Sequence, residues 1–272
     1  MGASTASICV IGGGAMGGAI ACGLVESGTC PASHVTVCDH NASKLEALAR
    51  ACGVRTTKDA ARALESSPDV VIVAVKPQVL SSLLEEVGPA VAGSLAVSIA
   101  AGTSLASLEE QLGEGARVVR VMPNLPVAVR RGASAVAGGL WATPEDVDLV
   151  CELFGALGSV AVMREDQLDA EGAVIGCAPA YFALMVDALT RAGVDAGLPA
   201  ASARDLACTT MGGVSEMLSR SGEHPRAYME KVTSPGGTTA AALRALEPAL
   251  AQGCYDAVDA ALERTRALSQ KG

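Results

Sequence analysis

The sequence predicts an α/β fold, with an N-terminal doubly wound parallel sheet followed by an all-helical domain. Strand and helix patterns alternate over roughly the first 160 residues, and strand patterns stop after about Met163. Half of the residues are apolar but only 2% are aromatic, so the core must consist of Ala, Val, Leu and Ile. Such a core suits parallel strands covered by closely packed helices. A chain of 272 residues is long enough for two domains of this kind.

The alternation is read from short β-branched runs and helical spacings. The predicted strands cover residues 7–12, 34–39, 69–75, 94–100 and 117–123. The predicted helices cover residues 15–27, 42–53, about 79–87 and 105–112, and a further one that begins with Thr143 as N-cap and Pro144 at its first position. Strand–helix alternation of this kind implies a doubly wound parallel sheet with right-handed crossovers.

The second half shows only helical spacing. Tyr181, Leu184, Met185, Ala188, Leu189 and Ala192 form one apolar stripe, and further helices are expected after Pro199, from Thr238 to Glu247 and from about Tyr255 to Leu268. We therefore expect two domains, residues 1–162 with the sheet and residues 163–272 with the helices. So much apolar helical surface favours a homo-oligomeric interface.

Composition excludes several classes of function. A net charge of −9 and the absence of any Lys/Arg run argue against a nucleic-acid partner. The three histidines and nine cysteines show no metal-ligand spacing, so we expect no metal. We interpret Cys9, Cys38, Cys177 and Cys208 as reduced core residues. We expect no signal peptide and nothing near a membrane span, and hence a soluble cytoplasmic protein without a membrane partner.

A glycine-rich motif directly follows the first predicted strand. Gly12, Gly14 and Gly17 form G-x-G-x-x-G at the start of a predicted helix. In this pattern the first glycine permits a tight turn, the second lets the backbone approach a pyrophosphate, and the third lets helix and strand pack closely. The strand–turn–helix context predicts dinucleotide binding rather than a purely structural turn.

Asp39 ends the second predicted strand. An acidic side chain at this distance hydrogen-bonds the adenosine ribose hydroxyls of NAD and repels the 2′-phosphate of NADP. An ordinary role as a helix cap is compatible with that position. If Asp39 turns away, Asn41, Ser43 and Lys44 could hold a phosphate, so NADP and NAD both stay open as cofactors.

A second glycine-rich helix start lies near the other end of the chain. "TSPGGTT" (233–239) runs into a helical Ala/Leu pattern. Free N–H groups at a helix start, together with hydroxyls and glycines, predict an anion site.

Five motifs occur in a characteristic order. They are "GGGAMGG", "AVKPQ" (74–78), "SIAAG" (98–102), "MPNLP" (122–126) and "SPGGTT" (234–239). With them the sequence resembles the pyrroline-5-carboxylate reductases over nearly its whole length. The resemblance implies a Rossmann domain followed by a helical dimerisation domain, in a homodimer or an assembly of dimers. It also implies an enzyme of proline biosynthesis, which uses NADPH or NADH to reduce the C=N bond of 1-pyrroline-5-carboxylate to L-proline.

The resemblance also implies roles for particular residues. The cofactor would contact Gly12, Gly14, Ala15, Met16 and Gly17 at its pyrophosphate, Ala74, Lys76 and Pro77 at its nicotinamide ribose, and Asn124 near its nicotinamide. The substrate carboxylate and ring would contact Ser234, Gly236, Gly237, Thr238 and Thr239. Thr239, with Thr238, is the candidate to hydrogen-bond the ring nitrogen or donate a proton. One helix start would then receive the pyrophosphate and the other the carboxylate.

Other functions fit the same layout. Leu125, Ile175, Cys177 and Ala178 depart from the usual family pattern, which leaves open a related imine reductase for a modified pyrroline. A hydroxyacid or 6-phosphogluconate-type dehydrogenase would need a lysine base in the first long helix of the second domain, but residues 172–193 contain no lysine. A non-catalytic nucleotide-binding regulator is the third alternative.

Overall fold

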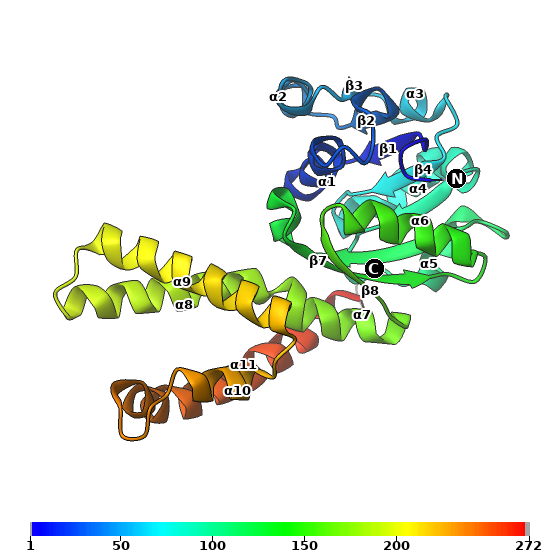
Figure 1. Ribbon diagram of the computed structural model, residues 1–272. Helices are drawn as coiled ribbons and strands as arrows, with labels where there is room; N and C mark the ends of the chain where they lie inside the picture. Colours follow the sequence, from blue (N-terminus) through cyan, green and yellow to red (C-terminus); the bar gives the residue numbers. More distant parts are fainter. Residues whose placement is uncertain (1, 270–272) are drawn as a thin grey trace. The chain divides into compact units, whose positions relative to one another are not determined.

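The computed structural model describes residues 2–269, which form two compact units. Residues 2–177 with 261–269 make up the first unit, and residues 178–260 make up the second (Figure 1). The elements of the first unit are β1 (Ile8–Ile11), α1 (Ala15–Glu26), η1 (Ala32–His34), β2 (Val35–Cys38), α2 (Ala42–Cys52), β3 (Arg55–Thr57), α3 (Ala60–Leu64), β4 (Val70–Val73), α4 (Pro77–Ala92), β5 (Leu95–Ser98), α5 (Leu105–Leu112), β6 (Val118–Pro123), η2 (Leu125–Val129), β7 (Gly132–Gly138), α6 (Pro144–Gly155), β8 (Gly158–Val162), α7 (Glu165–Glu171) and the π-helical turn η3 (Gly172–Gly176).

One sheet organises the first unit, with strand order β3-β2-β1-β4-β5-β6-β7-β8. The order 3-2-1-4-5-6 is that of a Rossmann domain, so the predicted fold class is confirmed. Every predicted strand and helix of this half is present, and Thr143 caps α6 as expected.

The predicted parallel sheet has one departure, at β7, which runs antiparallel to β6. The physical reason is the connection: η2 has five residues, which is too short for the crossover that parallel neighbours require. Strands β3, β7 and β8 were not expected, since "RTT" is short and polar and "GASAVAG" is rich in Gly and Ala.

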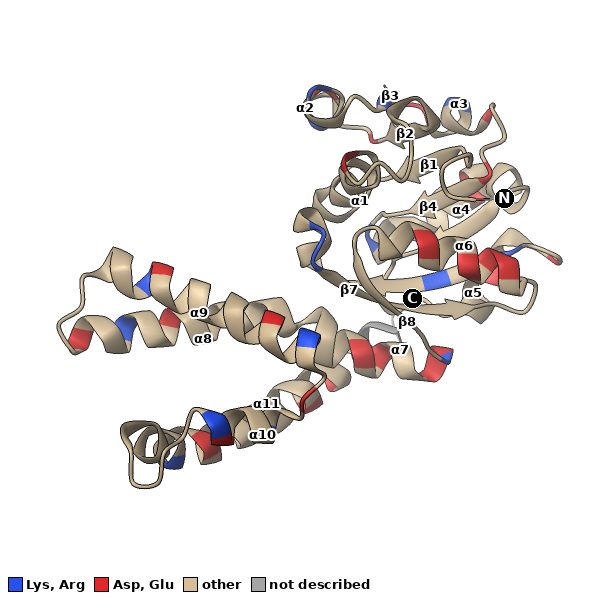
Figure 2. Ribbon diagram, viewed as in Figure 1, with Lys and Arg blue, Asp and Glu red and all other residues tan. Residues whose placement is uncertain are grey.

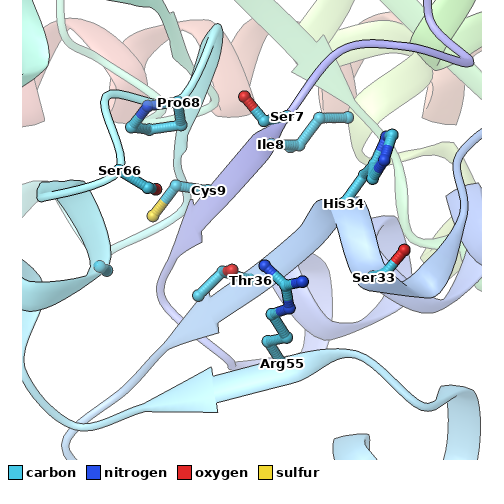
Figure 3. Close-up of a pocket in the computed structure, with 10 residues that line it drawn as sticks. Ser7, Ile8, Cys9, Ser33, His34, Thr36, Arg55, Ser66 and Pro68 are labelled. Atoms are coloured by element: carbon cyan, nitrogen blue, oxygen red, sulfur yellow. The ribbon is translucent and has the colours of Figure 1, made fainter.

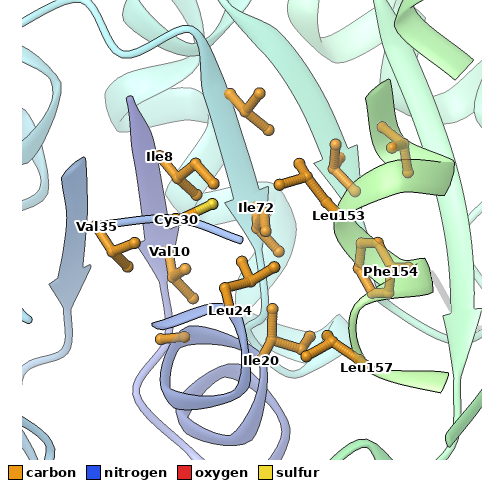
Figure 4. Close-up of a cluster of buried hydrophobic side chains, with 14 of the residues drawn as sticks. Ile8, Val10, Ile20, Leu24, Cys30, Val35, Ile72, Leu153, Phe154 and Leu157 are labelled. Atoms are coloured by element: carbon orange, nitrogen blue, oxygen red, sulfur yellow. The ribbon is translucent and has the colours of Figure 1, made fainter. Parts of the chain in front are cut away.

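Helices cover both faces of the sheet, and successive strand residues point to opposite faces. Ile8 and Val10 of β1 pack with Ile20 and Leu24 of α1 and with residues of α2 and α6 (Figure 4). Cys9 and Ile11 pack on the other face, with residues of α3, α4, α5 and α7. The central strands β1, β4 and β5 therefore contribute to both cores, and their sequences are continuous or nearly continuous apolar runs.

The first compact unit extends past the last strand, through α7 and η3. β8 ends at Val162, where the strand patterns were expected to stop, but the compact first unit continues to residue 177. Leu168 of α7 is fully buried in the core, and Arg120 of β6 pairs with Glu165 and Asp169 of α7. The chain from 163 to 177 is thus helical but packs on the sheet.

The second unit is all-helical. It contains α8 (Ala178–Asp195), α9 (Ala200–Ser221), α10 (Pro225–Lys231) and most of α11 (Thr238–Ser269). The two helices expected after Thr238 are one continuous helix with Pro248 inside it. The last three residues of the predicted domain lie outside the described part of the chain.

Apolar side chains on these helices are exposed in the single chain. Figure 2 shows α8 and α9 with few charged residues. Leu184 and Leu206 are more than 60% exposed, which fits the expectation of an interface between copies. By length and composition alone, the run Glu165–Asp195 could also cross a membrane, since an 18-residue window within it has a mean hydropathy of 1.6. One such helix is weak evidence for a membrane span.

The cysteines differ from their expected roles. Cys9 and Cys38 are buried and unbonded, as expected, but Cys208 is exposed and Cys177 is only half-buried, so neither is a core residue. Cys208 lies on the exposed apolar surface of α9, which explains its apolar sequence context. A disulfide joins Cys22 to Cys52, a pair that their separation of 30 residues does not suggest.

Candidate functional site

The glycine motif forms the turn between β1 and α1. Gly12 has φ of +113°, and a Cβ there would lie 2.5 Å from the carbonyl oxygen of Ala74. A Cβ at Gly17 would lie 2.0 Å from the carbonyl oxygen of Gly12. Both positions therefore require glycine, for the tight turn and for the approach of helix to strand.

Gly14 differs from these two glycines, because a Cβ there would meet no protein atom within 4 Å. Gly14 is the N-cap of α1, and no side chain of α1 caps its first turn. The first N–H groups of a helix lack intrahelical partners and carry partial positive charge, so they bind anions. The predicted pyrophosphate contact would lie in this open space, in front of the N–H groups of Ala15 and Met16.

Asp39 lies just behind this turn, with its side chain directed inward. It is 8% exposed, and its two oxygens accept hydrogen bonds from the backbone N–H groups of Gly13 and Asn41, each at 2.8 Å. Lys44 Nζ lies 3.7 Å from one oxygen, and the exposed ring of His40 lies 3.6 Å from the other. The carboxylate therefore supports the glycine turn and the start of α2. A contact between Asp39 and the adenosine ribose is still only a prediction.

Asn41 is the side chain that caps α2. Its oxygen accepts hydrogen bonds from the Lys44 N–H at 3.3 Å and from the Ser43 hydroxyl at 2.7 Å. His40, Ser43 and Lys44 thus surround the start of α2 at the carboxyl end of β2, with the lysine about half-exposed.

Residues of the next predicted group lie at the carboxyl end of β4. Ala74 follows β4 directly and donates its N–H to the Ile11 carbonyl at 2.8 Å, which places it beside the glycine turn. Lys76 is the N-cap of α4 and Pro77 is its first residue. The Lys76 side chain is exposed and has no ion-pair partner among the described residues, which agrees with an ammonium directed to solvent or a ribose.

Asn124, at the carboxyl end of β6, is buried and connects two elements. Its side-chain oxygen accepts the Ala133 N–H at 2.8 Å, and its nitrogen donates to the Ile175 carbonyl at 3.3 Å. Asn124 therefore fastens η3 to the end of the sheet. Ligands of open α/β sheets bind at these carboxyl ends, so the position fits the predicted place near a nicotinamide.

Glu171 was not expected from the sequence. It ends α7 immediately before η3, it is 9% exposed, and its Oε2 has no hydrogen-bond partner among the described residues. Burial raises the pKa of this carboxyl to about 7. Only its acidic character within an apolar stretch, "EGAVIG", could have drawn attention to it.

The second predicted anion site is the turn before α11, in the helical unit. Pro235 and Gly236 occupy its centre, Gly236 has φ of +71°, and the Gly237 N–H donates to the Ser234 carbonyl at 3.0 Å. These are the features of a type II turn, in which a glycine takes the left-handed position. Thr238 and Thr239 then open a 32-residue helix, so their N–H groups and hydroxyls lie at its positive end.

A separate hollow lies at the opposite edge of the sheet. It has a volume of about 160 Å³ and is lined by residues at the amino ends of the strands, among them Ser7, His34 and Arg55 (Figure 3). None of the predicted site residues lines it.

Comparisons with known proteins agree with this arrangement. Residues 7–102 match the family described as NADP oxidoreductase coenzyme F420-dependent, and residues 165–268 match the family described as pyrroline-5-carboxylate reductase dimerisation. The Rossmann order, the glycine turn and the first of these matches define a pyridine-nucleotide-binding oxidoreductase fold.

Whole-chain relatives identify the family. The chain is 36% identical to a pyrroline-5-carboxylate reductase of Corynebacterium melassecola, over 97% of this chain and 99% of that one. It is 39% identical to the Arabidopsis thaliana enzyme, over 96% and 94%. It therefore belongs to the pyrroline-5-carboxylate reductases.

Solved structures support the same family. A pyrroline-5-carboxylate reductase from Coxiella burnetii matches with a TM-score of 0.90 and 33% identity, over 97% of this chain and 99% of that one. A Plasmodium falciparum pyrroline carboxylate reductase with NADP bound matches with a TM-score of 0.87 and 26% identity, over 98% and 100%.

Proposed function

We propose that this protein reduces 1-pyrroline-5-carboxylate to L-proline with a reduced nicotinamide dinucleotide, as a step of proline biosynthesis. Similarity to named reductases over at least 96% of the chain carries this proposal. The match of the helical half to a dimerisation family and its exposed apolar side chains indicate a homo-oligomer. A cytoplasmic location and the size of the oligomer remain predictions.

For the cofactor we infer a preference for NADPH. Asp39 is oriented inward and already accepts two backbone N–H groups, so it presents little charge to a 2′-phosphate. The half-exposed Lys44 and the exposed His40 flank the start of α2, where the adenosine ribose of a Rossmann cofactor lies. A cation and the N-terminus of α2 both favour a phosphate at this place.

For the substrate we assign the carboxylate to the turn before α11. The N–H groups at the start of a long helix, together with the hydroxyls of Ser234 and Thr239, provide donors without an arginine. A Cβ at Gly237 would lie 2.3 Å from the Ser234 hydroxyl, so this glycine keeps the turn closed around its donors.

The reaction itself demands little acid–base chemistry from the chain. The reduced nicotinamide, when bound, supplies a hydride to the imine carbon. A pyrroline nitrogen is basic enough to be substantially protonated near neutrality, so the protein mainly orients the substrate. Thr239 is the candidate group to hydrogen-bond the ring nitrogen.

Reductase assays test this proposal. Purified protein should oxidise NADPH in the presence of 1-pyrroline-5-carboxylate and yield proline. Thr239→Val should lower kcat/KM by about ten- to a hundred-fold, because it removes a charge-assisted hydrogen bond worth ~1.5–3 kcal/mol. Thr239→Ser keeps the hydroxyl and should retain most activity. Equal losses in both variants, or weaker NADPH binding in Thr239→Val, would contradict the assigned substrate site.

A further inference from the structure

Helices α1 and α2 pack against each other through two successive pairs of residues, Gly18 with Leu48 and Cys22 with Cys52. We call this line of contact the seam. On α2, Leu48 and Cys52 are four residues apart and therefore lie on one face. On α1, Gly18 and Cys22 are likewise four residues apart. A Cβ at Gly18 would lie 3.0 Å from Leu48 Cδ2, so this glycine lets α2 approach α1 closely.

The next turn of the seam is the disulfide between Cys22 and Cys52. Their Cα atoms are 5.3 Å apart, which is well within the range that a disulfide spans. Both residues are half-buried rather than enclosed in the core. The bond therefore closes the seam beside the Leu48–Gly18 contact.

The remaining cysteines do not offer a comparable pair. The other seven are unbonded. Three of them, Cys9, Cys30 and Cys38, are fully buried, and burial raises their thiol pKa values to about 12, 11 and 11. Such thiols react slowly because the thiolate is the reactive form. These three thiols should therefore compete little with Cys22 and Cys52 for a dilute oxidant. The four that are half-buried or exposed, Cys151, Cys177, Cys208 and Cys254, form no disulfide in the structure.

Both bonded helices begin at the proposed binding region for the adenosine half of the cofactor. α1 starts at the glycine turn, and α2 starts after its N-cap Asn41, with Lys44 in its first turn. Leu48 also contacts the turn itself, since a Cβ at Gly13 would lie 3.3 Å from its Cδ1. A restraint on the seam therefore restrains the position of α2 against the glycine turn.

We propose that Cys22 and Cys52 are a site of reversible oxidation, and that their disulfide strengthens binding of the nicotinamide dinucleotide. The second half of this proposal rests on the proposed function of the glycine turn. In the structure, which contains the disulfide, the glycine turn is already ordered: the Gly13 N–H donates a hydrogen bond to the Asp39 carboxylate at 2.8 Å. Holding two binding elements in place before the ligand arrives lowers the entropy cost of binding.

The oxidant we infer is a low-molecular-weight disulfide. One cysteine thiolate attacks a sulfur of this disulfide, which forms a mixed disulfide and releases one small thiol. The second cysteine thiolate then attacks the protein sulfur and releases the other small thiol. The two cysteines lose two electrons and two protons in total, and the oxidant becomes two thiols.

Thiol counting tests the chemical half without any cofactor. The full-length protein, equilibrated with mixtures of reduced and oxidised glutathione, should lose two alkylatable thiols together, and mass spectrometry should identify the Cys22–Cys52 link. The oxidised form should melt about 5–10 °C above the reduced form, because the bond closes a long loop. Cys254→Ser, at an exposed unpaired cysteine, should oxidise identically, whereas Cys22→Ser should not. A glutathione adduct on single cysteines, without the link, would overturn the proposal.

Linkage to the cofactor tests the second half. NADP⁺ should bind the oxidised protein at least about five-fold more tightly, and by reciprocity it should shift the glutathione equilibrium toward the disulfide by the same factor. The Cys22→Ser/Cys52→Ser variant should bind like the reduced protein under both conditions. Equal NADP⁺ affinity in both redox states would overturn the regulatory role. These measurements depend on NADP⁺ binding and not on catalysis. If the protein binds NADP⁺ but does not reduce 1-pyrroline-5-carboxylate, that result contradicts the proposed function and leaves this inference standing.

Discussion

Lys44 offers a sharp test of the proposed cofactor preference. Its ammonium is about half-exposed and lies 3.7 Å from the buried Asp39 carboxylate, beside the capped start of α2. Lys44→Gln removes the positive charge and keeps a long polar side chain. If a 2′-phosphate binds at this place, the variant should lose affinity for NADPH and not for NADH.

The size of the effect follows from the exposure of the charge. Two unit charges about 4 Å apart attract by ~1 kcal/mol in water and by ~4 kcal/mol at an effective dielectric constant of about 20. Half-exposure puts Lys44 nearer the lower value, and the adjacent Asp39 offsets part of its field. A net loss of about 1–1.4 kcal/mol raises KM for NADPH by about five- to ten-fold.

Steady-state kinetics with both cofactors, at low and at high salt, measures this directly. The NADPH effect should shrink at high salt, because ions screen exposed charges. Arg50→Gln is the matched control, since Arg50 is an exposed cation on the same helix that pairs only weakly with Glu46 at 4.0 Å. An equal rise in KM for NADPH and NADH in Lys44→Gln would refute the reasoning.

Three further outcomes are expected from the first unit. Gly12→Ala should lower the melting temperature, because its Cβ would clash with backbone, whereas Gly14→Ala should leave the melting temperature unchanged and weaken NADP⁺ binding. Folding raises the pKa of Glu171 from about 4.5 to about 7, so the protein should lose stability as the pH rises through this range and the buried carboxyl loses its proton. Glu171→Gln cannot ionise, and it should therefore have a higher melting temperature than the parent at pH 8 but not at pH 5. A fragment ending at residue 162 should melt below one ending at residue 177, because it removes both carboxylate partners of the buried Arg120.

Local rules predicted most of the first unit. The start of α1 at Ala15 and the end of α2 at Gly53 depend on the backbone conformation of one or two residues. Both can therefore be predicted from the local sequence, without knowing which segments pack nearby. The direction of β7 is different, because it depends on how five residues after Asn124 turn the chain. "GASAVAG" has weak strand propensity and forms a strand because β6 and β8 lie on either side of it.

The candidate site shows the same limit. The spacing of Gly12, Gly14 and Gly17 predicted the turn that the structure contains. The inward orientation of Asp39 was not predictable, since it depends on the Gly13 and Asn41 N–H groups being near enough to compete with a ligand. The Cys22–Cys52 pairing could not be predicted from the sequence either, because α1 and α2 must pack together before the two sulfur atoms come within bonding distance.

The two predicted anion sites, if they bind their ligands, would also explain how a chain with a net charge of −9 binds anions. Each site is the start of a helix, where N–H groups provide positive potential without a side-chain cation. The backbone fixes the positions of these N–H donors, and their electrostatic field is weak at long range. They therefore select among anions by the shape of the anion and its distance from the donors. Long-range repulsion by the net charge acts mainly on the rate of association and weakens with salt. Raising ionic strength should therefore speed association of NADPH, whereas screening of a local cation such as Lys44 should oppose that trend.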